Sequence, residues 1–173
     1  MTILFYRRVP ETGPENRCPP WPDIRLWRPG RDGLPGAGPW RASNAAWWGV
    51  DRLGLFANHD FTEISLWDGR WLLHRLILTP RWYRFPFMAS EDLQIGDVWT
   101  EPHARGQGLA GLGVAIALAQ AGGDRRVWYV VEADNDPSIR LIERCGFERV
   151  GEGLRTKPFG LGILGRFVPR RHR

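Results

Sequence analysis

The stretch from Asp97 to Ala110, DVWTEPHARGQGLA, most constrains what this chain can fold into. The alternating residues of 93–100 predict a strand, which ends before Pro102 because proline removes a main-chain donor. Residues 109–121 are rich in Leu and Ala and predict a helix. A strand that runs through glycines into a helix N-terminus leaves several main-chain N–H groups pointing at one place, reinforced by the helix dipole. The stretch therefore predicts an anion site, most often one for a phosphate group.

Length and composition indicate one domain, residues 1–173, of a cytoplasmic protein. With 173 residues and 43% hydrophobic residues, the chain can bury a sizeable core. No apolar run approaches the roughly 20 residues that cross a bilayer, and the first residues do not have the pattern of a signal peptide. Cys18 and Cys145 are far apart and have no metal-ligand spacing, so we expect reduced cysteines and no metal.

The basic residues do not form a nucleic-acid-binding pattern. The net charge is +5 and Lys157 is the only lysine, but the arginines are scattered along the chain. The one basic cluster is the tail, residues 166–173, which we interpret as a solvated terminus. A weak contact of this tail with anionic lipid or with an acidic partner is the alternative.

The order of the predicted elements indicates an α/β protein with a mixed sheet that has helices on its faces. Residues 1–40 are rich in proline and glycine and predict an irregular arm with one strand, 23–27. A helix is expected over 41–59, and Asp68-Gly69 predicts a hairpin between two strands. The strands that we expect from residue 60 onward are 63–67, 71–78, an edge segment 82–88, 93–100, 126–132, one that begins with 147–150, and 161–167. A short helix is expected to begin at 136 and to end at Gly146.

Gly106-Gln-Gly-Leu-Ala-Gly111 also fits the dinucleotide-binding pattern G-x-G-x-x-G, with Glu132 at the end of the next strand as the ribose-binding acid. This interpretation would make the protein an oxidoreductase or a nucleotide-binding domain. The charged residues His103 and Arg105 crowd the turn, and about 40 residues after Glu132 are too few for the further units of a doubly wound sheet. The hairpin before the turn also predicts a mixed sheet instead of a parallel one.

A second segment agrees with a different family. Arg105-Gly-Gln-Gly-Leu-Ala110 has the form R-x-x-G-x-A, and some 25 residues later comes NDPSIRLIERCGF, residues 135–147. Together the two segments resemble the GNAT superfamily of acyl-CoA-dependent N-acyltransferases, over about residues 41–168. The resemblance implies a mostly antiparallel mixed sheet in which two parallel strands, here 93–100 and 126–132, splay apart to admit the pantetheine arm of acetyl-CoA.

The resemblance also implies which residues hold acetyl-CoA. Glycines at 106 and 108 allow the close approach of a pyrophosphate to main-chain donors. Main-chain groups on the first splayed strand would pair with the pantetheine arm as an added strand does, and Asn135 would bond to that arm. The cofactor-binding residues implied are Val98, Thr100, Arg105, Gly106, Gln107, Gly108, Leu109, Ala110, Asn135 and Ser138. Asn135 as a helix cap without a ligand is the alternative interpretation.

Acyl transfer from the thioester to a primary amine needs a base, a donor for the carbonyl oxygen and a proton for the leaving thiolate. Asp97 is the candidate base, and Glu101, His103 and Glu132 are the other residues near the splay that could take this role. The family's usual tyrosine after the leucine is replaced by Ile142, which cannot donate a proton, so Ser138 or water would take that role. A bulge at the splay would change which face each residue occupies.

The partners implied are acetyl-CoA and an amine acceptor, with no nucleic acid and no transmembrane segment. A small molecule is favoured as the acceptor, and a macromolecule is the alternative. The sequence does not decide between a monomer and a homodimer. The tryptophan-rich first half of the chain is the expected location of the acceptor pocket, although most of its tryptophans are expected to lie in the core. A domain that holds CoA without turnover is the alternative from a different class.

Overall fold

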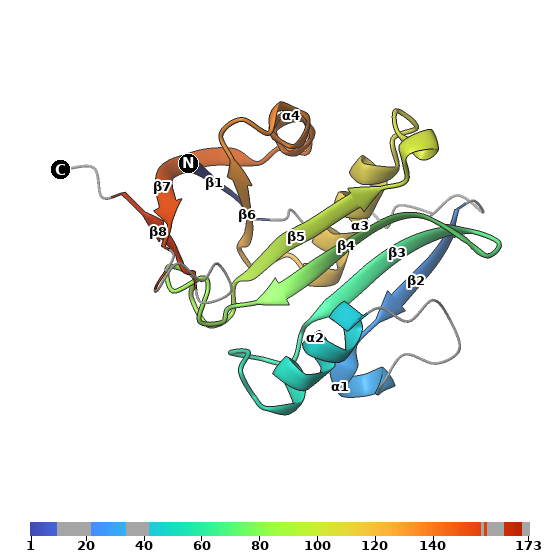
Figure 1. Ribbon diagram of the computed structural model, residues 1–173, viewed down its shortest axis with the longest axis horizontal. Helices are drawn as coiled ribbons and strands as arrows, with labels where there is room; N and C mark the ends of the chain where they lie inside the picture. The colour runs from blue at the N-terminus through green and yellow to red at the C-terminus, as the bar shows by residue number, and fades with distance from the viewer. Residues whose placement is uncertain (10–21, 34–41, 157, 159–164, 171–173) are drawn as a thin grey trace.

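The structure, a computed structural model, describes residues 1–9, 22–33, 42–156, 158 and 165–170. Its strands form an eight-stranded sheet (Figure 1) in the order β2-β3-β4-β5-β6-β1-β7-β8. The strands are β1 (Ile3–Arg8), β2 (Asp23–Trp27), β3 (Thr62–Asp68), β4 (Trp71–Pro80), β5 (Leu93–Thr100), β6 (Val127–Glu132), β7 (Glu148–Arg155) and β8 (Phe167–Pro169). The helices are α1 (Pro29–Asp32), α2 (Ala42–Arg52), α3 (Leu109–Ala121) and α4 (Asp136–Arg144), with the 3₁₀ turn η1 (Pro102–Ala104).

Among the described strands, β5 and β6 form the only parallel pair, and every other neighbouring pair is antiparallel. The mixed, mostly antiparallel sheet that the sequence predicts is therefore confirmed. A doubly wound dinucleotide fold needs a run of parallel strands with crossover helices, so this architecture does not fit the oxidoreductase alternative.

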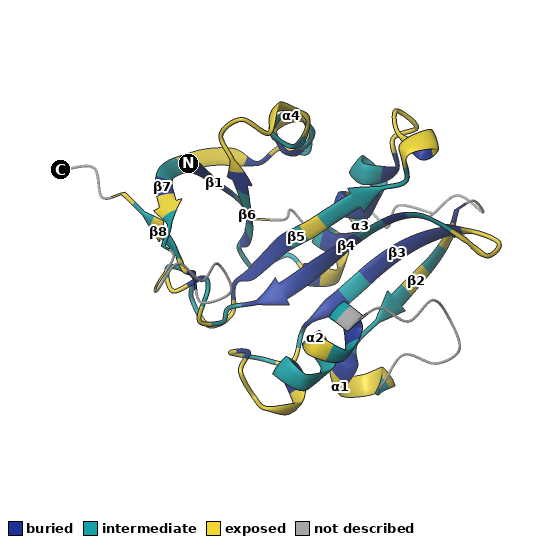
Figure 2. Ribbon diagram, in the orientation of Figure 1, coloured by how far each residue is buried: buried dark blue, intermediate teal, exposed yellow. Residues whose placement is uncertain are grey.

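Helices cover both faces of the sheet, and the alternation of β4 shows which residues face which side. Leu76 and Leu78 pack in the main core with residues of α3 and α4, whereas Ile77 packs in a second cluster with residues of α2. Successive strand residues point to opposite faces, so α3 and α4 cover one face and α2 covers the other. Figure 2 shows the most buried segments in the centre of the sheet, and exposed residues over much of α4 and around η1.

The first strand was not predicted. An irregular arm over residues 1–40 is wrong for Ile3–Arg8, because β1 lies inside the sheet between β6 and β7 and is antiparallel to both. Residues 3–6 are buried whichever face they point to, as expected for a strand with neighbours on both sides and layers above and below. The strand predicted at 23–27 is confirmed as β2, at the edge of the sheet.

Three further boundaries differ from the prediction. The helix expected over 41–59 ends at Arg52, because the chain turns at Gly54, whose φ is 64°. Residues 82–88 form turns instead of an edge strand, held by main-chain bonds such as Phe85 N–H to Trp82 O at 3.0 Å. The last described strand is 167–169, and most of the expected strand 161–167 lies outside the described residues.

Candidate active site

The two parallel strands pair over a short length and then diverge around a groove. β5 and β6 are in register only from Leu93 opposite Val127 to Ile95 opposite Tyr129. Beyond that point the strands separate (Figure 1), and a cavity of about 350 Å³ lies between them. It is lined by Ile95, Gly96, Asp97, Val98, Tyr129, Val130, Val131, Glu132, Asn135 and Ser138. The facing edges of the two strands therefore present main-chain groups that no ladder between them uses.

A bulge in β5 shapes one wall of this groove. β4 pairs Ile77 with Gly96 and Arg75 with Trp99, so two residues of β5 stand opposite one residue of β4. Asp97 has a φ of 49°, the only positive φ among the described non-glycine residues. An aspartate tolerates this left-handed conformation better than most residues do. The bulge that could occur at the splay is therefore present at Asp97.

The bulge distributes the side chains over the two faces of the sheet. Val98 packs on the α3 side, together with Ile95. The carboxylate of Asp97 instead forms an ion pair with the guanidinium of Arg75, which belongs to the α2 side as Ile77 does. Consequently the charged wall of the groove faces α2, and the apolar wall faces α3 and α4.

The glycine turn at the end of β5 has the geometry of an anion site. Gly106 and Gly108 both have a φ of 78°, a left-handed conformation that glycine adopts without strain. Gly108 is the N-cap of α3 and offers no side-chain cap. Within the described part of the chain, the N–H groups of residues 106–110 have no main-chain acceptor, so they are available to a ligand oxygen.

Side-chain contacts hold the glycine turn in place. Arg105 donates from Nε to the carbonyl oxygen of Thr100 at 3.2 Å, and Gln107 donates to the carbonyl oxygen of His103 at 3.3 Å. Leu109 is buried in a cluster with Ala104. The contact of Arg105 therefore holds the loop against the end of β5.

Thr100 has a structural bond of its own. Its Oγ1 lies 2.8 Å from Nδ1 of His74, a fully buried histidine on β4. Burial lowers the pKa of His74 to about 4, with a further contribution from the Arg75 charge, so the ring is neutral at pH 7. The side chain of Thr100 therefore points away from the groove into the α3 side of the sheet.

Asn135 and Ser138 meet at the start of α4, on the other side of the groove. Oδ1 of Asn135 accepts from the main-chain N–H of Ser138 at 3.3 Å, so Asn135 is the N-cap of this helix. Its side-chain N–H₂ has no partner among the described residues and lies in the lining of the groove. The capping role is confirmed, and it leaves the amide donors available to a ligand.

Tyr129 is a groove residue that the sequence analysis did not single out. It is the last residue of β6 that pairs with β5, it is 4% exposed, and it lines the groove. Burial raises the pKa of its phenol, and the interaction with the Ser138 hydroxyl partly offsets that rise. The alternating pattern of residues 127–132 could have predicted that Tyr129 faces α4. It could not have predicted that Ser138 lies beside Tyr129, because that depends on how α4 packs.

Ile142, which stands where a tyrosine is usual, is fully buried in the main core and does not line the groove. Of the predicted residues, Asp97, Val98, Glu132, Asn135 and Ser138 line one cavity. The predicted loop residues 105–110 do not line this cavity and lie between η1 and the first turn of α3. Thr100, whose main-chain groups are the predicted contact, does not line the cavity either.

Comparison with known proteins agrees with this architecture. Residues 66–147 match the acetyltransferase (GNAT) family model. A GNAT-family protein of Novosphingobium aromaticivorans has a TM-score of 0.50 at 16% identity, over 87% of this chain and 60% of that one. A GCN5-related N-acetyltransferase from Sphaerobacter thermophilus gives 0.50 at 17% identity, over 87% and 49%. A transcriptional regulator from Bacillus halodurans gives 0.52 at 21% identity, over 68% and 77%.

The family match over residues 66–147 confirms the resemblance that the sequence motifs indicate, and the solved structures share the fold. The chain spans 60% or less of the length of the Novosphingobium and Sphaerobacter structures. No protein of curated function matches the chain. No described helix is long and apolar enough to cross a membrane, and the described residues contain no group of three or more His, Cys, Asp or Glu side chains that could hold a metal ion.

Proposed function

We propose that the protein is an N-acetyltransferase that moves an acetyl group from acetyl-CoA to a primary amine, by direct attack of the amine on the thioester. The observation that carries the proposal is the groove between β5 and β6, which begins where their pairing ends. A pantetheine arm in this groove would find unpaired strand edges on both sides. Its pyrophosphate would bind the N–H groups of residues 106–110.

The two faces of the sheet divide the chemistry between them. The α3 side is filled by core residues, so the acceptor amine approaches from the α2 side, where the Asp97 carboxylate lies. Asp97 orients the amine and accepts a proton, directly or through water. The amine nitrogen forms a bond to the carbonyl carbon, the carbon–sulfur bond breaks, and a main-chain N–H near Val98 stabilises the negative charge on the carbonyl oxygen.

The leaving thiolate needs a proton from the opposite wall. Ser138 is our candidate from the sequence, and we add Tyr129, whose hydroxyl interacts with Ser138 in the lining of the groove. The phenol supplies the proton to the sulfur, and Ser138 relays a replacement from solvent at the mouth of the groove. This pair takes over the task that Ile142 cannot perform.

A thermal-shift series tests the cofactor. Acetyl-CoA and CoA should both stabilise the protein, by about 2.7 kcal/mol at a hundredfold excess over Kd, and NAD(H) should not. Release of free thiol from acetyl-CoA in the presence of a panel of small primary amines then tests turnover. Stabilisation by NAD(H) alone would contradict the proposal, and stabilisation by CoA without thiol release would instead identify a CoA-binding module.

Gly108→Glu tests the loop. The new carboxylate would occupy the anion site with a charge of the same sign as the phosphates, so CoA affinity should be lost. A side chain at a left-handed glycine costs roughly 1–2 kcal/mol by itself, so Gly54→Glu is the control. Gly54 lies in the turn after α2, with a φ of 64° and open space around it. Equal CoA affinity in the two folded variants would refute the loop assignment.

A further inference from the structure

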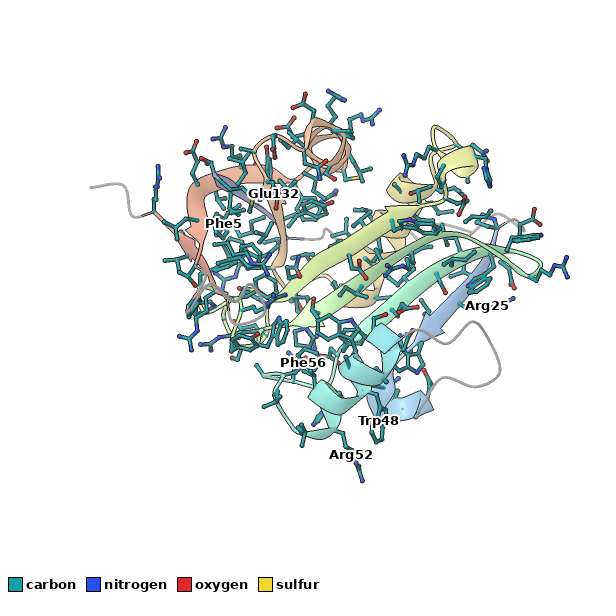
Figure 3. The ribbon with its side chains drawn as sticks, in the orientation of Figure 1. Phe5, Arg25, Trp48, Arg52, Phe56 and Glu132 are labelled. Atoms are coloured by element: carbon teal, nitrogen blue, oxygen red, sulfur yellow. The ribbon has the colours of Figure 1, made fainter. Side chains whose placement is uncertain are left out.

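A second cavity lies apart from the groove and uses none of its residues. It measures about 380 Å³ and is lined by Leu55, Phe56, Ala57, Arg81, Trp82, Tyr83, Pro86 and Arg166. These residues come from the turn after α2, the connection between β4 and β5, and the segment before β8. Figure 3 shows Phe56 beside α2, well separated from Glu132 of the groove. The acyl-transfer proposal does not account for this cavity.

Main-chain bonds fix the walls of this second cavity to one another. Ala57 donates its N–H to the carbonyl oxygen of Arg81 at 2.8 Å, which joins the turn after α2 to the β4–β5 connection. Phe167 donates its main-chain N–H to the carbonyl oxygen of Arg84 at 2.9 Å, which joins the start of β8 to the β4–β5 connection. Arg166 is further held by its own N–H, which donates to Oγ1 of Thr156 at 2.9 Å. A ligand would therefore meet a pocket that is already formed, and little ordering would oppose its binding.

Aromatic packing stiffens the apolar part of the lining. The rings of Trp82 and Tyr83 meet edge to face, with their centroids 4.8 Å apart, and Trp82 packs edge to face on Phe56 at 6.0 Å. Below them, Phe85 stacks on Phe167 at 5.3 Å. Leu55, which is 53% exposed, completes an apolar surface that remains open to solvent. A flat apolar body would bury this surface at a favourable free energy.

The polar part of the lining carries positive charge only. Arg81 and Arg166 line the cavity, no carboxylate does, and neither guanidinium has an acidic partner among the residues described. Other arginines of the chain do have acidic partners, as Arg75 has in Asp97 and Arg126 has in Asp92 at 3.0 Å. A guanidinium presents a planar fork of N–H donors that matches a carboxylate.

We propose that this second cavity binds a small organic carboxylate with a flat aromatic body, with Arg81 and Arg166 on the carboxylate and the Trp82 and Leu55 walls on the ring. The site is separate from the acetyl-CoA groove, and its existence does not depend on acyl transfer. A ligand of this class would be held by charge at one end and by apolar burial at the other, as in other pockets of this size.

Isothermal titration with 2-naphthoate, and with neutral 2-naphthylmethanol as its matched control, tests this proposal. The carboxylate should bind at least tenfold more tightly than the alcohol. Arg81→Gln and Arg166→Gln should each weaken naphthoate binding about tenfold, which is the loss of one charge-assisted contact. Arg170→Gln, a change to an exposed arginine outside the lining, should leave the affinity unchanged.

Two further measurements separate this site from the groove and from a folding defect. Leu55→Glu adds a negative charge at an exposed position and should abolish naphthoate binding, whereas Leu55→Gln should retain most of it. Saturating acetyl-CoA should not displace naphthoate. Equal binding of the acid and the alcohol, unchanged affinity in both arginine variants, or displacement by acetyl-CoA would each overturn the proposal.

Discussion

Asp97 and Arg75 form an ion pair across the bulge of β5, at the point where that strand leaves β6. The pair fixes the aspartate carboxylate on the α2 side of the groove, although the backbone at Asp97 adopts a conformation that most residues avoid. Strained positions of this kind concentrate at sites of function. Asp97 therefore determines the shape of the groove through its backbone conformation and adds a negative charge to the groove through its carboxylate.

Two substitutions at this position separate the backbone from the carboxylate. Asp97→Gly keeps the left-handed conformation without strain, and Asp97→Asn tolerates it while losing the charge. If the carboxylate accepts the amine proton, both variants should lose at least about tenfold in kcat/KM with acetyl-CoA and the acceptor. The free energy of unfolding should fall by less than about 1 kcal/mol, because the pair is partly exposed. Full activity in Asp97→Gly would assign Asp97 a structural role only.

The strand, turn and helix that surround the glycines could be predicted to the residue. β5 and α3 have the bounds expected for them, because alternation and helix-forming composition are local signals. The parts that the sequence did not yield depend on distant contacts. β1 is a strand because β6 and β7, more than 100 residues away in the chain, lie on both sides of it.

The same distinction applies to the site. The cofactor-binding positions 98, 135 and 138 follow from motifs and do line the groove. The bulge at Asp97 depends on a partner strand, and the position of Tyr129 beside Ser138 depends on how α4 packs. Motif spacing could not show either relationship, because both depend on contacts between distant segments of the chain.

Tyr129→Phe tests the proton donor. The variant keeps the ring and loses the hydroxyl, so kcat should fall by about ten- to a hundredfold, while the KM for acetyl-CoA changes little. Since burial raises the pKa of Tyr129, the wild-type rate should show no loss from phenol ionisation below the ordinary tyrosine pKa, about 10. The measurement is initial rate against pH for both proteins.

Tyr6→Phe is the matched control for this experiment. Tyr6 stands directly opposite Tyr129 in the sheet and is equally buried, but its hydroxyl donates to Glu143 at 2.8 Å and it does not line the groove. Its kcat should stay within about twofold of wild type, although the lost hydrogen bond should lower stability by about 1 kcal/mol. A loss of kcat as large as that of Tyr129→Phe would remove the case for a specific proton donor.

Two glycines of α3 give a prediction about packing. A Cβ at Gly113 would lie 2.5 Å from Nε2 of His74 and 3.1 Å from Cδ2 of Leu76, whereas a Cβ at Gly111 meets nothing within 4 Å. Gly113→Ala should therefore lower the free energy of unfolding by about 1–2 kcal/mol through overpacking. Gly111→Ala should raise it by about 0.5–1 kcal/mol through helix propensity. Urea unfolding of both variants is the measurement, and equal shifts would show that α3 does not lie against β4 as described.

His74 predicts how stability depends on pH. Its pKa is about 4 in the folded protein and 6.5 as a free side chain, so the unfolded chain binds the extra proton between these values. The contribution of the neutral ring is complete above pH 6.5 and is lost as the pH falls toward 4. Between pH 7.5 and pH 5 the histidine should account for a loss of about 2 kcal/mol in the free energy of unfolding.

His74→Asn removes the titrating ring, so urea unfolding of wild type and variant at the two pH values isolates its contribution. The variant is expected to be less stable at pH 7.5, because it leaves space in the core beside Gly113, but its stability should fall by about 2 kcal/mol less on acidification. His103→Asn is the control, since that histidine is exposed and pairs only with Glu101. Equal pH dependence in wild type and His74→Asn would mean that His74 accepts a proton within the folded structure at little cost.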